Sequence, residues 1–181
     1  KTVVVGFDSR ETSATFSQAV SKGICDAGAQ VFDIGLAGTE QMYFAVSFFQ
    51  ACVGIEITAS HNPIEYNGMK IVKQGSQPLT EIEFEKIKYI AELNNFVSVQ
   101  NNKLIVDKKS EALEAYVEKI LSFVDLENLD SRKIVINSGN GSAGPTIDFL
   151  TDKLEKIGVN TNFVLVHHDP DPIVLMRVLI R

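Results

Sequence analysis

Strand-like runs alternate with segments of helical periodicity in the first third of this chain. The runs lie at residues 2–5, 31–34 and 52–57, and the stretches between them have lengths that suit helices. One stretch has the three- and four-residue spacing of a helix face, formed by Phe16, Ala19, Val20, Gly23, Ile24 and Ala27. Residues 41–49 are apolar nearly all round, as in a buried helix. This order predicts an α/β fold, a three-layer α/β/α domain with a mostly parallel, mixed sheet.

The next segment continues the same architecture. Residues 69–72 predict a short strand, and Thr80 is placed to cap a helix that turns three isoleucines and an alanine toward the core, at positions 82, 87, 90 and 91. Residues 94–102 are polar and predict a loop. A further helix has Leu113, Tyr116, Val117, Ile120, Leu121 and Val124 on one face. The acidic connector that follows places a boundary, so we expect residues 1–130 to form the first domain.

The strand pattern restarts after this boundary. Residues 133–137 predict a strand, 138–144 a glycine-rich loop, and residues up to 157 a helix that leads to a strand at 163–166. One β-α-β unit leaves sheet edges unpaired and is too small to be a complete domain. We therefore expect residues 131–181 to be the start of a second, similar domain, with an atypical tail from about residue 169.

Composition excludes several classes of partner. The chain has 181 residues, 45% of them hydrophobic, and a formal charge of −6, so it lacks the basic surface that nucleic acid requires. Its apolar runs are shorter than the roughly 20 residues of a membrane span. It has two cysteines, which show neither metal-ligand spacing nor the density of a disulfide scaffold. We expect a globular protein of the cytoplasm that binds neither nucleic acid nor membrane.

The sequence Thr-Ala-Ser-His-Asn-Pro at residues 58–63 follows an apolar run directly. Asn-Pro starts turns, so Ser60 is expected just beyond the carboxyl end of a strand, where open α/β sheets bind ligands. Neighbouring side chains of an extended chain point to opposite faces, so we expect Ser60 and His61 not to form a hydroxyl–imidazole pair. The G-x-S-x-G motif is also absent, and both observations disfavour a serine hydrolase.

Cationic and donor groups accompany this serine. Arg10 ends another predicted strand, His61 is adjacent in sequence, and Lys70 follows the turn. Arginine binds phosphate oxygens bidentately and lysine provides a compact charge, so these residues suit a phosphoryl group that moves between oxygens.

Four motifs in order resemble those of the α-D-phosphohexomutases, which interconvert sugar 1-phosphates and 6-phosphates. They are Gly-x-Asp-x-Arg at 6–10, the Ser60 motif at 58–63, Asn-Gly-Met-Lys at 67–70 and Asn-x-Gly-Asn-Gly-x-x-Gly at 137–144. Within that family, Gly-Thr-Glu at 38–40 is similar to the bacterial phosphomannomutases. The resemblance covers most of the chain, to about residue 166.

The resemblance implies roles for four residues. Ser60 would carry a phosphate, donate it to the sugar and receive another from the hexose 1,6-bisphosphate intermediate. The phosphate on Ser60 would also help to hold Mg²⁺, the implied cofactor. Arg10 and Lys70 would lie near the reacting oxygens, with Lys70 a candidate general acid or base, and His61 would contact phosphate or sugar.

The resemblance also implies a substrate. We expect reversible phosphoryl transfer between mannose 6-phosphate and mannose 1-phosphate, with a hexose phosphate as the partner and no prediction of oligomeric state. Because the family's metal, sugar and phosphate-binding domains are missing, this chain alone is expected to be inactive. The alternatives are a phosphoglucomutase or phosphoglucosamine mutase of the same family, or a non-catalytic fragment that binds sugar phosphates.

Overall fold

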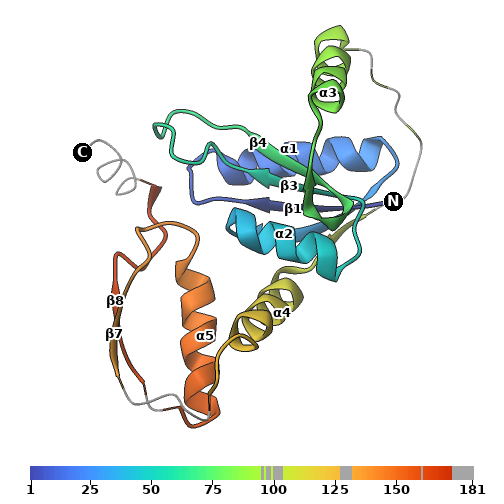
Figure 1. Ribbon diagram of the computed structural model, residues 1–181. Helices are drawn as coiled ribbons and strands as arrows, with labels where there is room; N and C mark the ends of the chain where they lie inside the picture. Colours follow the sequence, from blue (N-terminus) through green and yellow to red (C-terminus); the bar gives the residue numbers. More distant parts are fainter. Residues whose placement is uncertain (95, 97–98, 100–103, 127–131, 160, 173–181) are drawn as a thin grey trace.

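The computed structural model of the protein describes residues 1–94, 96, 99, 104–126, 132–159 and 161–172 (Figure 1). Strands and helices alternate along most of these residues. In chain order they are β1 (Thr2–Phe7), α1 (Ser13–Asp26), β2 (Gln30–Leu36), α2 (Thr39–Phe48), β3 (Val53–Ile57), β4 (Met69–Lys73), the 3₁₀ turn η1 (Gln74–Ser76), β5 (Gln77–Pro78), α3 (Glu81–Leu93), β6 (Ile105–Asp107), α4 (Lys109–Leu121), β7 (Lys133–Asn137), α5 (Gly144–Lys156) and β8 (Asn162–Val166).

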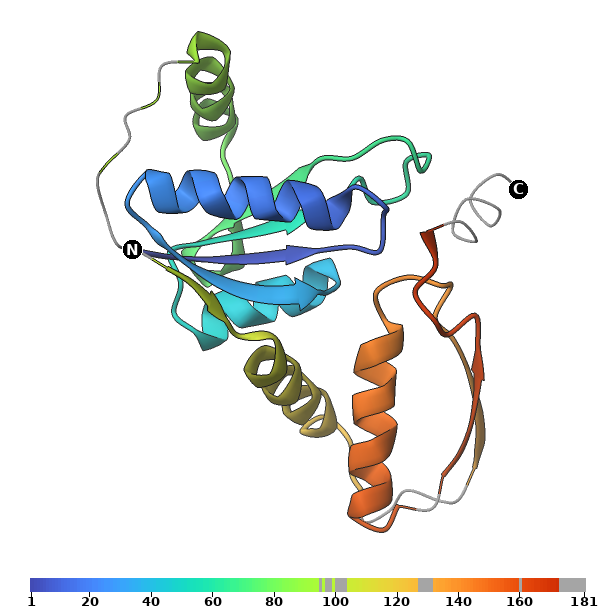
Figure 2. The same ribbon diagram turned by 180° about the vertical axis from the view of Figure 1, so that it is seen from behind.

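Six strands form the main sheet, in the order β5-β4-β3-β1-β2-β6. The pairs among β3, β1, β2 and β6 are parallel, whereas β4 is antiparallel to β3 and β5 is antiparallel to β4. Helix α1 covers one face of the sheet, and α2 with α4 lies on the other (Figures 1 and 2). The predicted three-layer α/β/α fold with a mostly parallel, mixed sheet is therefore confirmed. Strand β6 was not predicted.

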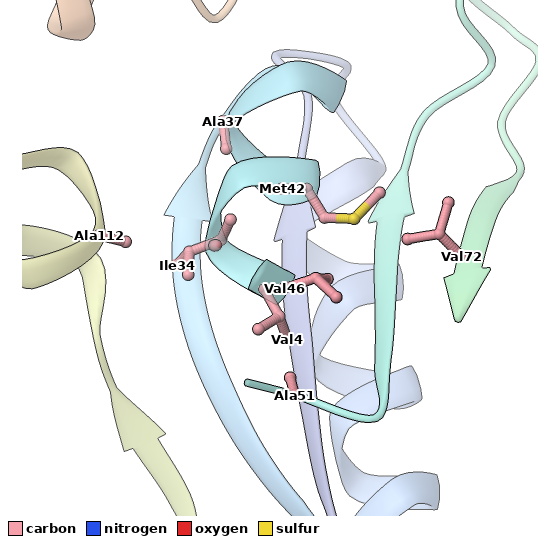
Figure 3. Packing of buried hydrophobic residues seen from close by; sticks show 9 residues of the cluster. Val4, Ile34, Ala37, Met42, Val46, Ala51, Val72 and Ala112 are labelled. Atoms are coloured by element: carbon pink, nitrogen blue, oxygen red, sulfur yellow. The ribbon is translucent and has the colours of Figure 1, made fainter. Parts of the chain in front are cut away.

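The core under α2 depends on a close approach between helix and sheet. Met42 and Val46 point from α2 toward the strands, and both are fully buried (Figure 3). They fit because Gly54 on β3 has no side chain: a Cβ there would lie 2.3 Å from Val46 Cγ2 and 2.5 Å from Met42 Sδ. This packing fixes the first turn of α2 beside the carboxyl ends of β1 and β3.

Replacing Gly54 by alanine is expected to destabilise the protein by about 1–3 kcal/mol, because the added methyl group overpacks this contact. Gly23 is the matched control, since a Cβ there meets no atom within 4 Å. Gly23→Ala lies inside α1 and should stabilise by up to about 1 kcal/mol. Urea unfolding of both variants checks the prediction, and equal effects would contradict it.

Helix α1 buries only part of the face that was predicted. Its fully buried residues are Ser13, Ser17 and Ser21, and Val20 and Ile24 pack partly against the sheet. Phe16, which was expected to face the core, is 46% exposed. The small serine side chains let α1 lie close to strands whose own valines fill the space, so the apolar stripe predicted from spacing is only half right.

Helix α3 also differs from the prediction. Thr80 does cap it: its hydroxyl accepts a hydrogen bond from the Glu83 amide, and the Glu83 carboxylate accepts one from the Thr80 amide. However, α3 has no buried residue, and Ile82 is 83% exposed. The helix projects away from the sheet (Figures 1 and 2), so its apolar residues do not face the core as expected.

Strands β7 and β8 form a separate two-stranded parallel sheet, joined by α5 in the predicted β-α-β order. Helix α4 contacts both α2 and α5, so it connects the two parts (Figure 2). The predicted domain boundary at residue 130, much of the predicted loop at 94–102 and the tail from residue 173 onward lie outside the described residues. The division into domains stays a prediction.

Candidate active site

Ser60 occupies a strained backbone position immediately after β3. Its φ angle is +55°, in the left-handed region that residues with a Cβ adopt only at a cost of about 1–2 kcal/mol. The Ser60 amide donates a hydrogen bond to the Thr58 hydroxyl at 2.9 Å, which supports this turn locally. The Ser60 side chain is exposed. The turn therefore presents the hydroxyl group at the carboxyl end of the sheet.

The structure corrects one expectation about Ser60 and His61. Ser60 Oγ lies 3.3 Å from His61 Nδ1, within hydrogen-bonding distance. Neighbouring side chains point to opposite faces only in an extended chain, and the left-handed conformation of Ser60 turns these two to the same side. His61 is itself exposed and, in the described part of the chain, bonds to no carboxylate. The pair therefore lacks the third member of a hydrolytic triad.

Arg10 is the buried support of the serine turn. Its side chain is 1% exposed, and Nη2 donates to the carbonyls of Ser60 and Asn62 at 2.7 and 2.8 Å. Nη1 donates to the carbonyls of Pro63 and Tyr66 at 2.8 and 3.0 Å. Nε donates to Asp8 at 3.2 Å. A guanidinium group has five N–H donors, and in this arrangement all five bond to the protein, so Arg10 holds the loop; its expected contact with a phosphate stays a prediction.

Asp8 and Asn67, from the motifs at 6–10 and 67–70, also help to hold the serine loop. The Asp8 carboxylate, which accepts from Arg10, also accepts from the Ser13 hydroxyl at 2.6 Å. Asn67 donates to the hydroxyls of Thr12 and Ser13 at 2.8 and 2.9 Å. The segments at 6–10 and 67–70 therefore meet at the start of α1 and fix both ends of the serine loop.

Replacing Arg10 by alanine is expected to destabilise the chain by about 3 kcal/mol or more, because four carbonyls and the Asp8 carboxylate lose a buried donor. Arg10→Lys keeps the charge but offers fewer donors, so amide hydrogen exchange across residues 58–68 should still become faster. Lys22→Ala, which removes an exposed ion pair with Asp26, is the control and should change stability by less than about 1 kcal/mol. A loop that exchanges at the parental rate in Arg10→Lys would contradict the assignment.

Ser60 lies between two hollows of different chemistry. The larger, of about 500 Å³, is lined by carboxyl and hydroxyl side chains and by the glycine-rich loop before α5, namely Asp8, Ser9, Ala37, Gly38, Thr39, Glu40, Glu56, Thr58, Ser60, His61, Gly139, Gly141 and Ser142. The smaller, of about 280 Å³, contains Lys70 together with Asn62 and Asn67. Lys70 is exposed, so the described residues do not supply the burial that a lysine base needs.

Glu56 is a site residue that the sequence did not predict. It lies on β3 between apolar neighbours, is 1% exposed and lines the larger hollow. Burial, reinforced by the nearby carboxylates of Asp8 and Glu40, raises the pKa of Glu56 from 4.5 to about 9, although Lys70 opposes the shift. A carboxyl group inside an apolar strand was the available sequence signal.

The raised pKa of Glu56 predicts a pH-dependent stability. Between pH 5 and 8 the folded chain keeps a proton that the unfolded chain releases, so the stability linked to this proton is complete below about pH 4.5 and is lost as the pH rises toward 9. The slope is at most about 1.4 kcal/mol per pH unit. Glu56→Gln should lack this loss. Urea unfolding of both proteins at pH 5–8 measures the difference, and parallel profiles would refute the linkage.

The described residues have three further features. They contain no group of three His, Cys, Asp or Glu side chains that could hold a metal ion. Within the same residues, no helix is both long and apolar enough to cross a membrane. A further hollow of about 580 Å³ lies between α5 and β8, but none of the predicted site residues lines it.

Fold and site together define an α/β/α domain that presents a serine loop at the carboxyl ends of parallel strands. A family model described as phosphoglucomutase/phosphomannomutase, alpha/beta/alpha domain I, matches residues 1–98. The chain belongs to this family, as its motifs predicted.

Individual relatives agree with this assignment. The chain is 41% identical to a phosphomannomutase of Escherichia coli strain K12 over 172 residues, which are 94% of this chain and 38% of that protein. It is 42% identical to a phosphomannomutase of Vibrio cholerae, with 94% and 37% covered. A crystal structure of a phosphoglucomutase/phosphomannomutase family protein from Burkholderia thailandensis superposes with a TM-score of 0.76 at 27% identity, covering 96% of this chain and 37% of that one. The chain thus spans less than two fifths of these relatives.

Proposed function

We propose that this chain is the phosphoserine-bearing part of a phosphomannomutase, an isomerase that interconverts mannose 6-phosphate and mannose 1-phosphate in the cytoplasm. The observation that carries the proposal is the Ser60 hydroxyl, held exposed in a left-handed turn by a buried arginine. Relatives named phosphomannomutase, about 41% identical over 94% of the chain, support the substrate class. Glucose and glucosamine phosphates are the alternative substrates within the family.

The proposed reaction has two balanced transfers. In the first, the bond between phosphorus and the Ser60 oxygen breaks and a bond forms to a free sugar hydroxyl, which gives a hexose 1,6-bisphosphate. The sugar hydroxyl loses a proton and the Ser60 oxygen gains one. In the second, the other phosphoryl group returns to Ser60 and the protons move in the reverse direction, so the enzyme is restored and the sugar phosphate is isomerised.

Two neighbouring residues suit the charges of this reaction. His61 Nδ1, at 3.3 Å from Ser60 Oγ, is within reach to give and take the proton of that oxygen. Lys70 lies with Ser60 around the smaller hollow, where its ammonium group would attract phosphate oxygens. Arg10 acts through the loop backbone in this proposal and not through the phosphate.

Magnesium is the proposed cofactor, and a phosphate on Ser60 would be its contact with this chain. The described residues do not otherwise fit a metal, since none of their carboxyl and imidazole groups form a ligand cluster. The remaining ligands would have to come from parts of the relatives that the chain does not span. No step of the reaction is therefore assigned to the metal.

A chimera tests the function directly. Residues 1–172 of this chain replace the matching segment of the Escherichia coli relative, and conversion of mannose 1-phosphate to mannose 6-phosphate is measured. Ser60→Ala should lower turnover by more than about a thousandfold, because the phosphoryl carrier is gone. Intact mass spectrometry should find one phosphoryl group on the parental chimera, located to Ser60, and none on the variant.

Ser47→Ala is the matched control, since Ser47 is exposed on α2 and lines neither hollow. It should retain turnover within about twofold. Mutase activity that survives Ser60→Ala, or a phosphate found on another residue, would overturn the proposal. Turnover of glucose phosphates in preference to mannose phosphates would change only the substrate.

A further inference from the structure

The Glu56 carboxyl group has no partner in the described chain. Glu56 is only 1% exposed, so both of its carboxyl oxygens are buried. Neither oxygen makes a hydrogen bond within the described residues. Buried polar groups in native proteins are nearly always paired, because an unpaired group has lost its hydrogen bonds to water without replacement. An unpaired carboxyl group at the wall of a hollow is therefore a candidate contact for a ligand.

The residue opposite Glu56 in the sheet leaves room for its carboxyl group. Glu56 on β3 pairs in register with Gly6 on β1. A Cβ on Gly6 would lie 2.5 Å from Glu56 Oε2, so no other residue at position 6 leaves the carboxyl group where it is. The glycine thus keeps the carboxyl group beside the larger hollow, next to the first turn of α2.

The two hollows beside Ser60 differ in the ligands that they can accept. The larger one combines Glu56, Asp8 and Glu40 with hydroxyl side chains, and neither lysine nor arginine lines it. The lining therefore offers a phosphate group no lysine or arginine to bind it. It also lacks a cluster of ligands able to hold a metal, among the residues described. Hydroxyl groups of a sugar remain, since they both donate to and accept from carboxyl and hydroxyl oxygens.

We propose that the larger hollow binds the hydroxyl-bearing ring of a hexose phosphate, with the Glu56 carboxyl group hydrogen-bonded to a ring hydroxyl and the phosphate on the Lys70 side of Ser60. This proposal rests on the proposed function, because it takes a hexose phosphate as the ligand. The raised pKa supports it, since an un-ionised carboxyl group offers a donor as well as an acceptor. Glu56 is then a sugar-binding residue in the wall opposite the glycine-rich loop.

Titration of the isotopically labelled 181-residue chain, followed by NMR, tests this division of the site. Mannose 6-phosphate should shift the amides of residues 38–40, 56 and 139–142 as well as those of 60–70. Inorganic phosphate should shift only residues 60–70. Glu56→Leu should weaken mannose 6-phosphate binding about tenfold, the effect of losing one good hydrogen bond, and leave the affinity for inorganic phosphate unchanged. Glu56→Gln, which keeps a donor and an acceptor, should lose no more than about threefold.

Two control measurements separate a lost sugar contact from a general loss of charge or of folding. Glu65→Gln removes an exposed carboxylate that lines neither hollow, and it should bind both probes as the parent does. Glu56→Leu should unfold at a higher temperature than the parent at pH 8, so weaker binding cannot be ascribed to unfolding. Equal affinity of Glu56→Leu and the parent for mannose 6-phosphate, identical shifts from the two probes, or no binding of mannose 6-phosphate overturns the inference.

A magnesium salt provides a third probe. Shifts around Glu56 on addition of magnesium chloride alone would assign the hollow to a cation and likewise overturn the proposal. Failure of the proposed function has a different readout, which is the absence of phosphate from Ser60 in the chimera. The NMR titration can therefore contradict the role of Glu56 while the chimera still carries a phosphate on Ser60. Conversely, the chimera can lack that phosphate while the titration still shows sugar binding.

Discussion

The buried guanidinium group of Arg10 determines the geometry on which the rest of the site depends. It bonds to four loop carbonyls and to Asp8, and the loop carbonyls lie at least 50 residues from Arg10 in sequence. The strained φ angle of Ser60 persists only because such contacts over-determine the turn. Folding of the strands brings Arg10 to the loop, and the loop in turn presents the hydroxyl group. A positively charged residue near the proposed phosphoryl carrier can therefore support the site through the loop backbone, without touching a phosphate.

Much of the architecture could be predicted because its causes are local. The nearly all-round apolar run at residues 41–49 indicated α2, the spacing of apolar residues indicated α4, and the cap at Thr80 marked the start of α3. Spacing cannot say which stripe meets the sheet, however. In α1 the buried positions are serines, while Val20 and Ile24 beside them are only partly buried against the core. The apolar face of α3 contains no buried residue. Strand β6 has three residues, too few for a pattern.

The site was predictable to the level of its motifs and no further. The serine turn, Arg10 and Lys70 were found in sequence, but their contacts depend on backbone angles and on register. Strict alternation of side chains would separate Ser60 from His61, and a single left-handed residue brings them to 3.3 Å. Glu56 was missed because nothing in a strand sequence shows that its neighbour across the sheet is Gly6; that pairing exists only once β1 and β3 are in register.

The unfavourable features of this fold gather at one edge of one sheet. The left-handed serine, the unpaired Glu56 carboxyl group and the glycine opposite it all lie at the carboxyl ends of β1 and β3. Elsewhere on the same sheet, Val4 and Val5 of β1 and Val31 of β2 are fully buried in the core. Gly6 makes room for the Glu56 carboxyl group, but the left-handed Ser60 gains nothing from either residue, so packing alone does not explain why these features coincide. A hexose phosphate bound as proposed would contact both the serine and the carboxyl group, and its binding free energy would compensate there for the cost of these features.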